Sequence, residues 1–586
     1  MASHSHHKSN ITPFRRLIAF LKPDRKDLLI LVLYTLLAGL LTLATPLAAQ
    51  ALVNTIAAGV FLQPLVVLTA LLFIGMLFAG FLRVSQFFIV EVLQRRAFAR
   101  VSLDMAKRVP FIQHHALATD YPPELLNRFF DIIKVQKSMA KLLLEGPAAI
   151  LQILVGLVLM AIYSPLLLGF DMFVLLFLGF TAFILGRNGV NTSLNESVEK
   201  YRIAGWLEEL ARCHMSFKMD GVPSYIFNKT DDQVIDFIHA RRSHFRILFN
   251  QAIANHFFQA VASAGILGLG GWLVIHRQLT LGQLVASELV ILIMLSAIDK
   301  LITMFQDWYG LLTGVEKIAQ VTDLPLERSG GKMLPQQAKE GAAVFCQDVS
   351  FSYQAGRPIL RNLNLSIQPG ELVSLVGASG IGKSTLANLI CGLLEPKTGL
   401  VEINGVDVRD ADLQSLRTAV SLVGDNHEIF DGTVEENIVV GRPIPQQDIR
   451  WALSVTQLMD EIADLPEGMK TRLISAGRNL SKGQMQRLLI ARAIVSRPRL
   501  LILDEAFNGI DERTKVTILE KLLQQNMPWT VIEISHDAEV VMRSNRVLVL
   551  ANGAIVESAP PYELARQEGS FFSTLFPELT IRAARR

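Results

Sequence analysis

The sequence is poor in charge and in cysteine. Only 19% of its 586 residues are Asp, Glu, Lys or Arg, and the net charge is +3, so nothing in the charge balance indicates a nucleic-acid partner. Cys213, Cys346 and Cys391 lie far apart without paired CxxC spacing, which favours reduced structural thiols over disulfides or a zinc site. A cleavable signal peptide is not expected, because residues 1–26 are polar and basic and the first apolar run is too long.

Long apolar stretches dominate the first half instead. Hydrophobic residues make up 51% of the chain, and 586 residues are too many for one ordinary domain. A membrane helix needs about 20 apolar residues to cross about 30 Å of hydrocarbon. Stretches of this kind lie at 28–50, 65–82, 146–163, 166–186, 257–275 and 281–305. We therefore predict an all-α transmembrane domain with six helices.

Basic residues beside these stretches predict their orientation. Arg and Lys gather before the first stretch, after the second and fourth, and before the fifth, whereas the opposite loops hold one basic residue, Arg277. Because basic loops stay on the cytoplasmic side, both termini are expected in the cytosol. The long connections 91–145 and 188–250 mix apolar and charged residues at helical spacing, so the membrane helices are expected to continue into the cytosol.

A few charged residues lie within or beside the apolar stretches. They are Arg83, Asp171, Glu288, Asp299 and Lys300. Charge in hydrocarbon is costly, so each marks a cavity, a partner or a helix end. Asp299 and Lys300 are expected to offset one another in part, and an interfacial position suits them at least as well as a substrate contact. Arg83 and Asp171 are the candidates for lining a cavity, and Asp171 is the better of the two. A solvated or lipid-headgroup position suits Asp171 about as well.

The second half has the pattern of an α/β domain with a phosphate-binding loop. After a polar connector with Pro325 and Pro335, the apolar run Leu372–Val376 predicts a buried strand. It leads into a helix through Gly377-Ala378-Ser379-Gly380-Ile381-Gly382-Lys383-Ser384, followed by Thr385. The glycines let backbone amides wrap the phosphates of ATP, Lys383 neutralises the β and γ phosphates, and Ser384 offers its hydroxyl to Mg²⁺.

Two further segments complete the candidate ATPase site. The apolar run Leu500–Leu503 predicts a second strand that delivers Asp504 toward Mg²⁺ and Glu505 to a water that attacks the γ-phosphate. His536 follows an apolar segment that ends at Ile534, and from the same sheet it would reach the γ-phosphate. Taken alone, either feature is more often a strand end or a surface histidine; the phosphate loop changes that balance.

With these residues in place, the whole chain resembles the ATP-binding cassette (ABC) exporters, as a half-transporter with one nucleotide-binding domain. The segment Leu480-Ser481-Lys482-Gly483-Gln484 resembles the family signature LSGGQ. The resemblance implies that Ser481, Gly483 and Gln484 contact ATP bound to a second subunit, so that the half-transporter must dimerise. It also implies that Tyr353 stacks on adenine and that Asn508–Asp511 forms the D-loop.

Two departures from the family pattern concern turnover. The Q-loop glutamine of the family falls on Asp425, which can still coordinate Mg²⁺; the expected metal ligands are therefore Ser384, Asp504 and Asp425. Lys482 stands where the family has glycine. Both changes are consistent with slower turnover. Because the catalytic set Lys383, Glu505 and His536 is present together with Ser481, two competent sites in a homodimer are still expected.

These features predict an ATP hydrolase with ATP and Mg²⁺ as cofactors that exports a substrate across the cell inner (cytoplasmic) membrane by alternating access. The expected parts are an N-terminal segment 1–26, a transmembrane domain 27–310, a linker 311–341 and a nucleotide-binding domain 342–586. Because the first span begins near residue 28, no N-terminal peptidase domain is expected. The partners are a second half-transporter, membrane lipids and the substrate. Lipids, drugs, peptides or a protein passed to a periplasmic adaptor all remain open as cargo. A nucleotide-gated or regulatory membrane protein without net transport is the alternative, whereas a DNA-repair or translation ATPase has little room beside six spans.

Overall fold

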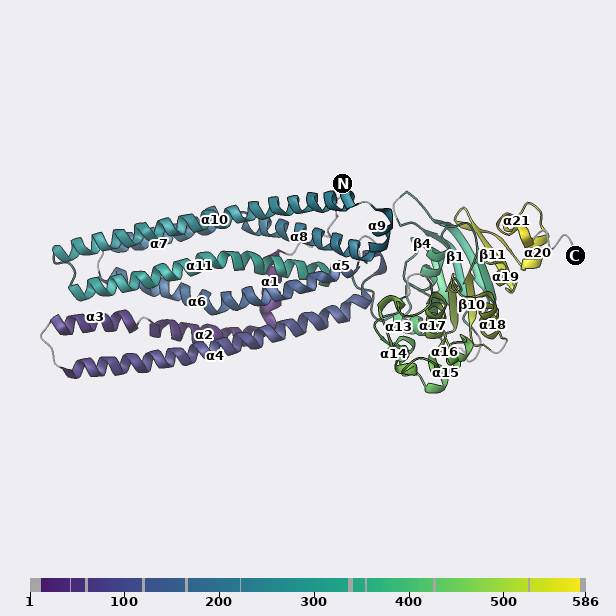
Figure 1. The fold of residues 1–586 in the computed structure, drawn as a ribbon, viewed down its shortest axis with the longest axis horizontal. Helices are drawn as coiled ribbons and strands as arrows, with labels where there is room; N and C mark the ends of the chain where they lie inside the picture. The colour runs from purple at the N-terminus through teal and green to yellow at the C-terminus, as the bar shows by residue number, and fades with distance from the viewer. Residues whose placement is uncertain are drawn as a thin grey trace. The chain divides into compact units, whose positions relative to one another are not determined.

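The computed structural model describes most of the chain. The described residues are 12–42, 44–57, 62–117, 122–163, 167–221, 223–335, 341–353, 356–424, 428–524 and 527–579. The chain divides into two compact units, Met1–Leu326 and Glu327–Arg586. The first is helical and the second is an α/β unit (Figure 1).

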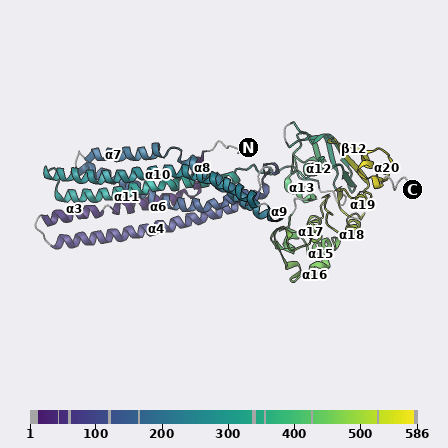
Figure 2. The same ribbon diagram turned by 45° about the horizontal axis from the view of Figure 1, so that its top comes forward.

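Helices make up the first unit, and the long ones run side by side in both views (Figures 1 and 2). They are α1 (Pro13–Leu21), α2 (Arg25–Thr42), α3 (Ala44–Ala57), α4 (Leu62–Arg108), α5 (Pro122–Leu126), α6 (Asp131–Tyr163), α7 (Leu167–Gly179), α8 (Gly189–Arg212), α9 (His214–Asp220), α10 (Pro223–Ile275) and α11 (Leu281–Thr322). A π-helix, Phe180–Leu185, joins α7 to α8.

α11 is the central helix of this bundle. It begins at a capping box, in which Thr280 Oγ1 accepts from the amide of Gln283 and the Gln283 side chain accepts from the amide of Thr280. From there it packs against α6, α3, α10, α1 and α8. Ile291 and Ile298 are almost fully buried, in a core that includes Met160 of α6 and Phe258 of α10. Apolar residues on several faces of one helix thus let it pack against several neighbours.

In the described part of the chain, the apolar stretches predicted from the sequence lie on helices. Judged by length and mean hydropathy, four helices in the described part of the chain can cross a membrane. They are Pro13–Thr55, Leu65–Phe111, Pro122–Ile162 and Pro223–Ile275, and the pair Met172–Leu185 and Gly189–Arg212, bent by 41°, makes a fifth if it counts as one span. The sixth predicted stretch, 281–305, lies in α11, which is not among these helices. The unit is that of a multi-pass membrane protein.

The second unit contains two main sheets. Antiparallel strands form the smaller sheet in the order β2 (Leu360–Ile367), β1 (Val344–Phe351), β4 (Thr398–Ile403), β5 (Val406–Asp407). The larger sheet has the order β12 (Ala554–Ala559), β11 (Arg546–Ala551), β3 (Leu372–Val376), β10 (Thr530–Ile534), β9 (Leu500–Asp504), β6 (Val420–Val423), and all but β12 run parallel. A short pair joins β7 (Gly432–Thr433) to β8 (Arg472–Leu473).

Helices cover the parallel sheet on both faces. Those of the second unit are α12 (Lys383–Ile390), α13 (Leu413–Ala419), α14 (Val434–Val439), α15 (Gln446–Val455), α16 (Met459–Ala463), α17 (Lys482–Ile494), α18 (Glu512–Leu522), α19 (Ala538–Val541), α20 (Pro561–Arg566) and α21 (Phe571–Leu575). One core encloses α12 between the two sheets, and the other lies beneath α17 and α18. Because β3, β10 and β9 are parallel neighbours, their carboxyl ends meet at one edge, where α/β sheets bind ligands.

Candidate nucleotide site

The phosphate loop leaves the carboxyl end of β3, whose five residues are all buried. Gly380 and Gly382 have φ angles of 75° and 113°, which an L-residue adopts only under strain. A Cβ on Gly382 would also lie 2.7 Å from the Ile359 side chain. The glycine spacing predicted from the sequence is therefore required here by both conformation and space, and α12 begins directly after Gly382.

Lys383 and His536 meet across the sheet. Lys383 Nζ donates to the carbonyl oxygens of Gly377 at 2.8 Å and Ala378 at 3.1 Å, and lies 3.2 Å from His536 Nε2. Burial lowers the pKa of Lys383, while the charges of Glu505 and Asp504 oppose that shift. The lysine is 7% exposed, so its charge is held at the loop by carbonyl dipoles and two nearby acids, in the position where a polyphosphate would be attracted.

The two acids at the end of β9 lie at the same edge. Glu505 has a positive φ of 54°, an uncommon conformation for a side chain with a Cβ and one that recurs at functional sites. Its backbone amide donates to Ile534 O at 2.9 Å, and its Oε2 accepts from Asn508 Nδ2 at 2.8 Å. Glu505 is thus anchored to β10 on one side and to the start of the D-loop segment on the other.

Tyr353 stands beside the same helix. Its hydroxyl lies 3.3 Å from Thr385 Oγ1 on α12, and its ring lies edge-on to Phe351 with centroids 5.0 Å apart. The side chain is 55% exposed, so an aromatic face is open to a stacking partner. The open face suits the predicted adenine contact.

The signature segment forms a second cluster. Ser481 caps α17 by a capping box with Gln484, and Gln484 Nε2 donates to Glu461 Oε2 at 2.9 Å. Arg487 pairs with the same carboxylate. A Cβ on Gly483 would lie 3.1 Å from Gly509 O, and one on Gly509 would lie 2.9 Å from Lys482 Cδ. Among the described residues, these hydrogen bonds run within the cluster and to Glu461, not to the phosphate loop.

The predicted metal ligands divide into two groups. Ser384, exposed at the start of α12, and Asp504, at the end of β9, come from elements that pack against each other. A hydroxyl and a carboxylate oxygen are ligands that Mg²⁺ accepts, with water and phosphate oxygens filling the rest, so these two residues fit the ion. Asp425 lies outside the described residues. Strand β6, which precedes it, pairs with β9, and Gly424 lies close to Asp504. The side chain of Asp171 also lies outside the described part.

Sequence reasoning missed a buried charged group behind His536. Lys515 of α18 is 5% exposed and pairs with two carboxylates. One belongs to Asp537, which follows His536, and the other to Glu512, at 2.6 Å. Beneath it lies Glu533 of β10, 2% exposed. Burial raises the pKa of Glu533 to about 8, helped by repulsion from Asp537 and opposed by Lys515. A charged residue between two isoleucines of a strand was the signal that would have revealed it.

Glu533 makes a pH prediction possible. Folding raises its pKa from 4.5 to about 8, so the folded state keeps a proton that the unfolded chain releases. The stability from this proton is complete below about pH 4.5 and is lost as the pH rises toward 8, by about 1.4 kcal/mol per pH unit at most. Thermal unfolding of the full chain between about pH 6 and pH 8 is expected to show this fall, and Glu533→Gln to flatten it. The control is Glu520→Gln, exposed on α18; equal slopes in wild type and Glu533→Gln would contradict the prediction.

This fold and site define an ABC-type nucleotide-binding unit joined to a helical membrane unit. Residues 360–508 match the family model described as "ABC transporter". Over 321 residues the chain is 36% identical to an "ATP-dependent lipid A-core flippase" of Thiobacillus denitrificans, covering 54% of this chain and 55% of that protein. Over 311 residues it is 32% identical to a "Leukotoxin translocation ATP-binding protein" of Mannheimia haemolytica, covering 53% of this chain and 44% of that protein.

A solved structure extends the likeness to the whole fold. The "Structure of a bacterial Atm1-family ABC exporter with ATP bound" superposes with a TM-score of 0.83 at 22% identity, covering 96% of this chain and 98% of that one. The chain spans about half the length of the curated relatives it matches. The resemblance to ABC exporters inferred from the motifs is thereby confirmed, for the nucleotide-binding unit by sequence and for the whole chain by fold.

Proposed function

We propose that this chain is an ABC half-transporter that uses ATP to export a substrate across a membrane. The observation that carries the proposal is the meeting of Lys383, His536 and Glu505 at the carboxyl ends of β3, β10 and β9. A phosphate loop, an acid that can take a proton and a histidine beside the phosphate lysine are the parts that ATP hydrolysis needs. The first unit has helices long and apolar enough to cross a membrane, so the energy of ATP hydrolysis can be coupled to transport.

Each side chain then has a role in hydrolysis. Lys383 gives up its carbonyl partners and bonds the phosphates of ATP. Ser384 and Asp504 would hold Mg²⁺, which would supply positive charge beside the phosphates. Glu505 accepts a proton from a water molecule as the water oxygen bonds the γ-phosphorus. The bond from that phosphorus to the β–γ bridging oxygen breaks, and ADP leaves with that oxygen. His536 Nε2 lies 3.2 Å from Lys383 Nζ, so it is beside the phosphates that the lysine binds. Once Lys383 has turned to them, Nε2 in its protonated tautomer donates a hydrogen bond to the γ-phosphate.

The separate signature cluster supports action as a dimer. Ser481 and Gln484 bond each other in the capping box, and Gln484 also bonds Glu461, so the N-terminus of α17 is held as a preformed phosphate-binding group. In the family it resembles, this segment completes the site of a second subunit. We therefore propose a homodimer that alternates access, closing on two ATP molecules and reopening after hydrolysis.

The location and the domain limits follow from the same proposal. We place the protein in the inner membrane with both termini in the cytosol. The ground for this orientation is that the loops rich in Arg and Lys stay on the cytoplasmic side. The division into segment 1–26, membrane domain 27–310, linker 311–341 and nucleotide-binding domain 342–586 is supported by the separation of two compact units.

The test is ATP hydrolysis and transport by the full chain in lipid nanodiscs and vesicles. Lipids, hydrophobic amines and peptides are added in turn; the first and last classes are suggested by the names of the relatives. Turnover that rises with one class, and movement of that class in vesicles only with ATP, is the expected result. ATP binding without turnover or transport would instead favour a nucleotide-gated regulatory protein, and Asp425→Gln would then be the first reversion to make.

Tyr353→Ala is expected to weaken ATP binding by about tenfold, because one stacking face is lost, with little change in kcat. Phe351→Leu is the control for the neighbouring ring, since Phe351 is 8% exposed and has no free face. Equilibrium binding of a fluorescent ATP analogue measures the effect. Unchanged affinity in Tyr353→Ala would remove the tyrosine from the site.

A further inference from the structure

An ion pair lies directly behind the segment that carries His536. Lys515 of α18 is 5% exposed, and its ammonium group pairs with Asp537, the residue after His536. Burial alone would raise the pKa of Asp537, but the bonds from Lys515 and from the amide of Glu539 hold that pKa below its ordinary value. Asp537 is therefore ionised at neutral pH, and the contact joins two full charges.

Asp537 is held at several atoms. Its carboxylate accepts from Lys515 and, at 2.9 Å, from the amide of Glu539 at the start of α19, and its own amide donates to Ser535 Oγ at 3.0 Å. His536 lies between these anchored residues, and its own side chain is exposed. Because little packing surrounds an exposed ring, the position of the imidazole follows from the backbone that Asp537 fixes.

The lysine of the pair belongs to the helix that follows the D-loop segment. α18 begins directly after Asn508–Asp511, and the amide of Lys515 donates to Asp511 O at 2.9 Å in the first turn. At the start of the same segment, Asn508 Nδ2 donates to Glu505 Oε2 at 2.8 Å. The ion pair therefore links the histidine segment to the residues that hold the proposed general base.

These contacts close a ring that contains both residues proposed to act at the γ-phosphate. One side of the ring runs from Glu505 through the D-loop segment and α18 to the ion pair and on to His536. The other side runs through β10, because the amide of Glu505 donates to Ile534 O at 2.9 Å, two residues before His536. Such a ring fixes the separation between Glu505 and His536. Opening it at the ion pair would leave the histidine attached to Glu505 through β10 alone.

We propose that the ion pair of Lys515 and Asp537 positions His536 for ATP hydrolysis. The pair touches no phosphate itself and acts through the histidine, by keeping the imidazole at the γ-phosphate while Glu505 takes a proton from water. This rests on the proposed function, because the pair has this role only where ATP is hydrolysed. Displacing a reacting group by about 1 Å can lower a rate by about 100-fold, so a contact outside the phosphate site can control turnover.

Glu512 provides a matched control on the same ammonium group. Its Oε2 lies 2.6 Å from Lys515 Nζ, but the side chain is 60% exposed and belongs to α18 itself. Glu512→Gln therefore removes a charge from the same lysine without loosening its link to His536. Glu533, the third acid beside the lysine, has its pKa raised to about 8 by burial. It is mostly protonated at neutral pH and does not replace Asp537 as the counter-ion.

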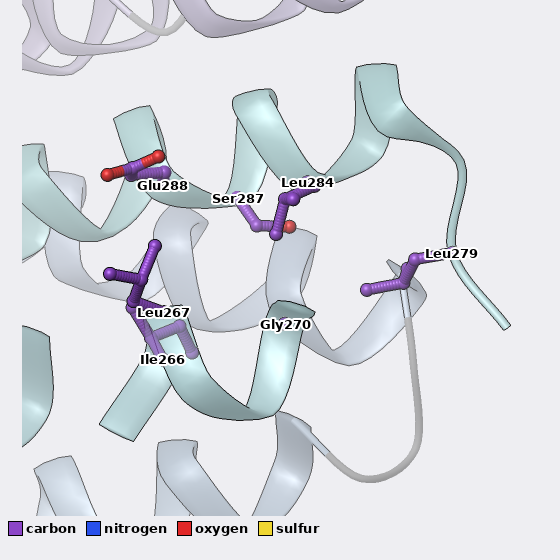
Figure 3. Close-up of a pocket in the computed structure, with 7 residues that line it drawn as sticks. All are labelled: Ile266, Leu267, Gly270, Leu279, Leu284, Ser287 and Glu288. Atoms are coloured by element: carbon purple, nitrogen blue, oxygen red, sulfur yellow. The ribbon is translucent and has the colours of Figure 1, made fainter. Parts of the chain in front are cut away.

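A remote control lies in the helical unit. Figure 3 shows Glu288 of α11 beside an apolar notch lined by Ile266, Leu267 and Gly270 of α10. Glu288→Gln removes one carboxylate from the chain, as Asp537→Asn does, and it touches none of the contacts in the ring. No change in kcat is expected from it.

The experiment measures kcat for ATP hydrolysis by the full chain in nanodiscs at neutral pH, together with the affinity for a fluorescent ATP analogue. Lys515→Met and Asp537→Asn are each expected to lower kcat by at least about tenfold and to leave ATP affinity unchanged, because the contacts of bound ATP are intact. Lys515→Arg keeps the charge and should keep most of kcat. Glu512→Gln should turn over like wild type. Unchanged ATP affinity also confirms that each variant is folded.

A double variant separates positioning from stability. Removing one partner of an ion pair leaves a charge without its counter-ion and destabilises the protein, whereas removing both leaves none. Lys515→Met combined with Asp537→Asn is therefore expected to unfold at a higher temperature than Lys515→Met alone, and yet to keep the low kcat. The amide oxygen of the Asp537→Asn side chain can still cap α19.

Three results would overturn the proposal. The first is wild-type kcat in Lys515→Met, and the second is an equal fall in Glu512→Gln. The third is recovery of kcat together with stability in the double variant, which would reduce the pair to a role in folding. Wild-type turnover that Lys515→Met leaves unchanged removes the positioning role and keeps the proposed function. A wild type that binds ATP without hydrolysing it overturns the proposed function and the positioning role with it.

Discussion

Glu505→Gln is expected to abolish ATP hydrolysis and to leave ATP binding intact. Glutamine keeps the size of the side chain and can still accept from Asn508 Nδ2, which bonds Glu505 Oε2 at 2.8 Å, but it cannot take a proton from water. Loss of a general base lowers the rate by about 100-fold or more. The bound ATP would then hold two chains together, so a dimer stable to size-exclusion chromatography with ATP should accumulate.

The control for Glu505→Gln is Glu563→Gln, an exposed residue of α20 far along the chain from the site. Phosphate release by the two variants is compared with wild type in nanodiscs. Continued wild-type turnover in Glu505→Gln would remove Glu505 as the base and leave only an electrostatic role for it.

Lys383→Ala is expected to have the second largest effect, on ATP binding. The variant removes the ammonium group that donates to both Gly377 O and Ala378 O, and with it a charge-assisted contact to the phosphates. Hydrogen bonds to charged groups contribute about 1.5–3 kcal/mol, so ATP affinity should fall by about 10- to 100-fold. Hydrolysis at ordinary ATP concentrations should then be lost.

Lys521→Ala on α18 serves as the matched control, since Lys521 donates to Ser454 O at 2.7 Å on the surface. Equilibrium binding of a fluorescent ATP analogue reports both variants. Should Lys383→Ala bind ATP as tightly as Lys521→Ala, the carbonyl contacts of Lys383 would be structural and the phosphate site would lie elsewhere.

The local parts of the nucleotide site were predictable from sequence because each is encoded by neighbouring residues. Gly380 and Gly382 turn the loop through φ angles that other residues resist, and Lys383 begins the helix that follows. Ser481 and Gln484 cap α17 within one turn. The apolar stretches likewise predicted helices, since hydropathy and length depend only on order along the chain.

The contacts between distant segments were not predictable in this way. Lys383 and His536 are 153 positions apart and touch only because β3 and β10 are parallel neighbours. Lys515 over Glu533 has the same origin, with α18 packed on the sheet that carries Glu533. Asp299 likewise accepts from Asn255 and Gln259 of α10, which lie 44 and 40 positions away.

The sequence by itself therefore determined the class of the protein, the phosphate loop, the acidic strand end and the helical nature of the first unit. These depend on backbone preferences, caps and hydropathy, which act over a few residues. Only the tertiary structure decided which distant residues meet: His536 with Lys383, the backbone of Glu505 with β10, and Asp299 with Asn255. Burial and pairing are properties of packed elements, and strand order and helix contacts are set by the core as a whole.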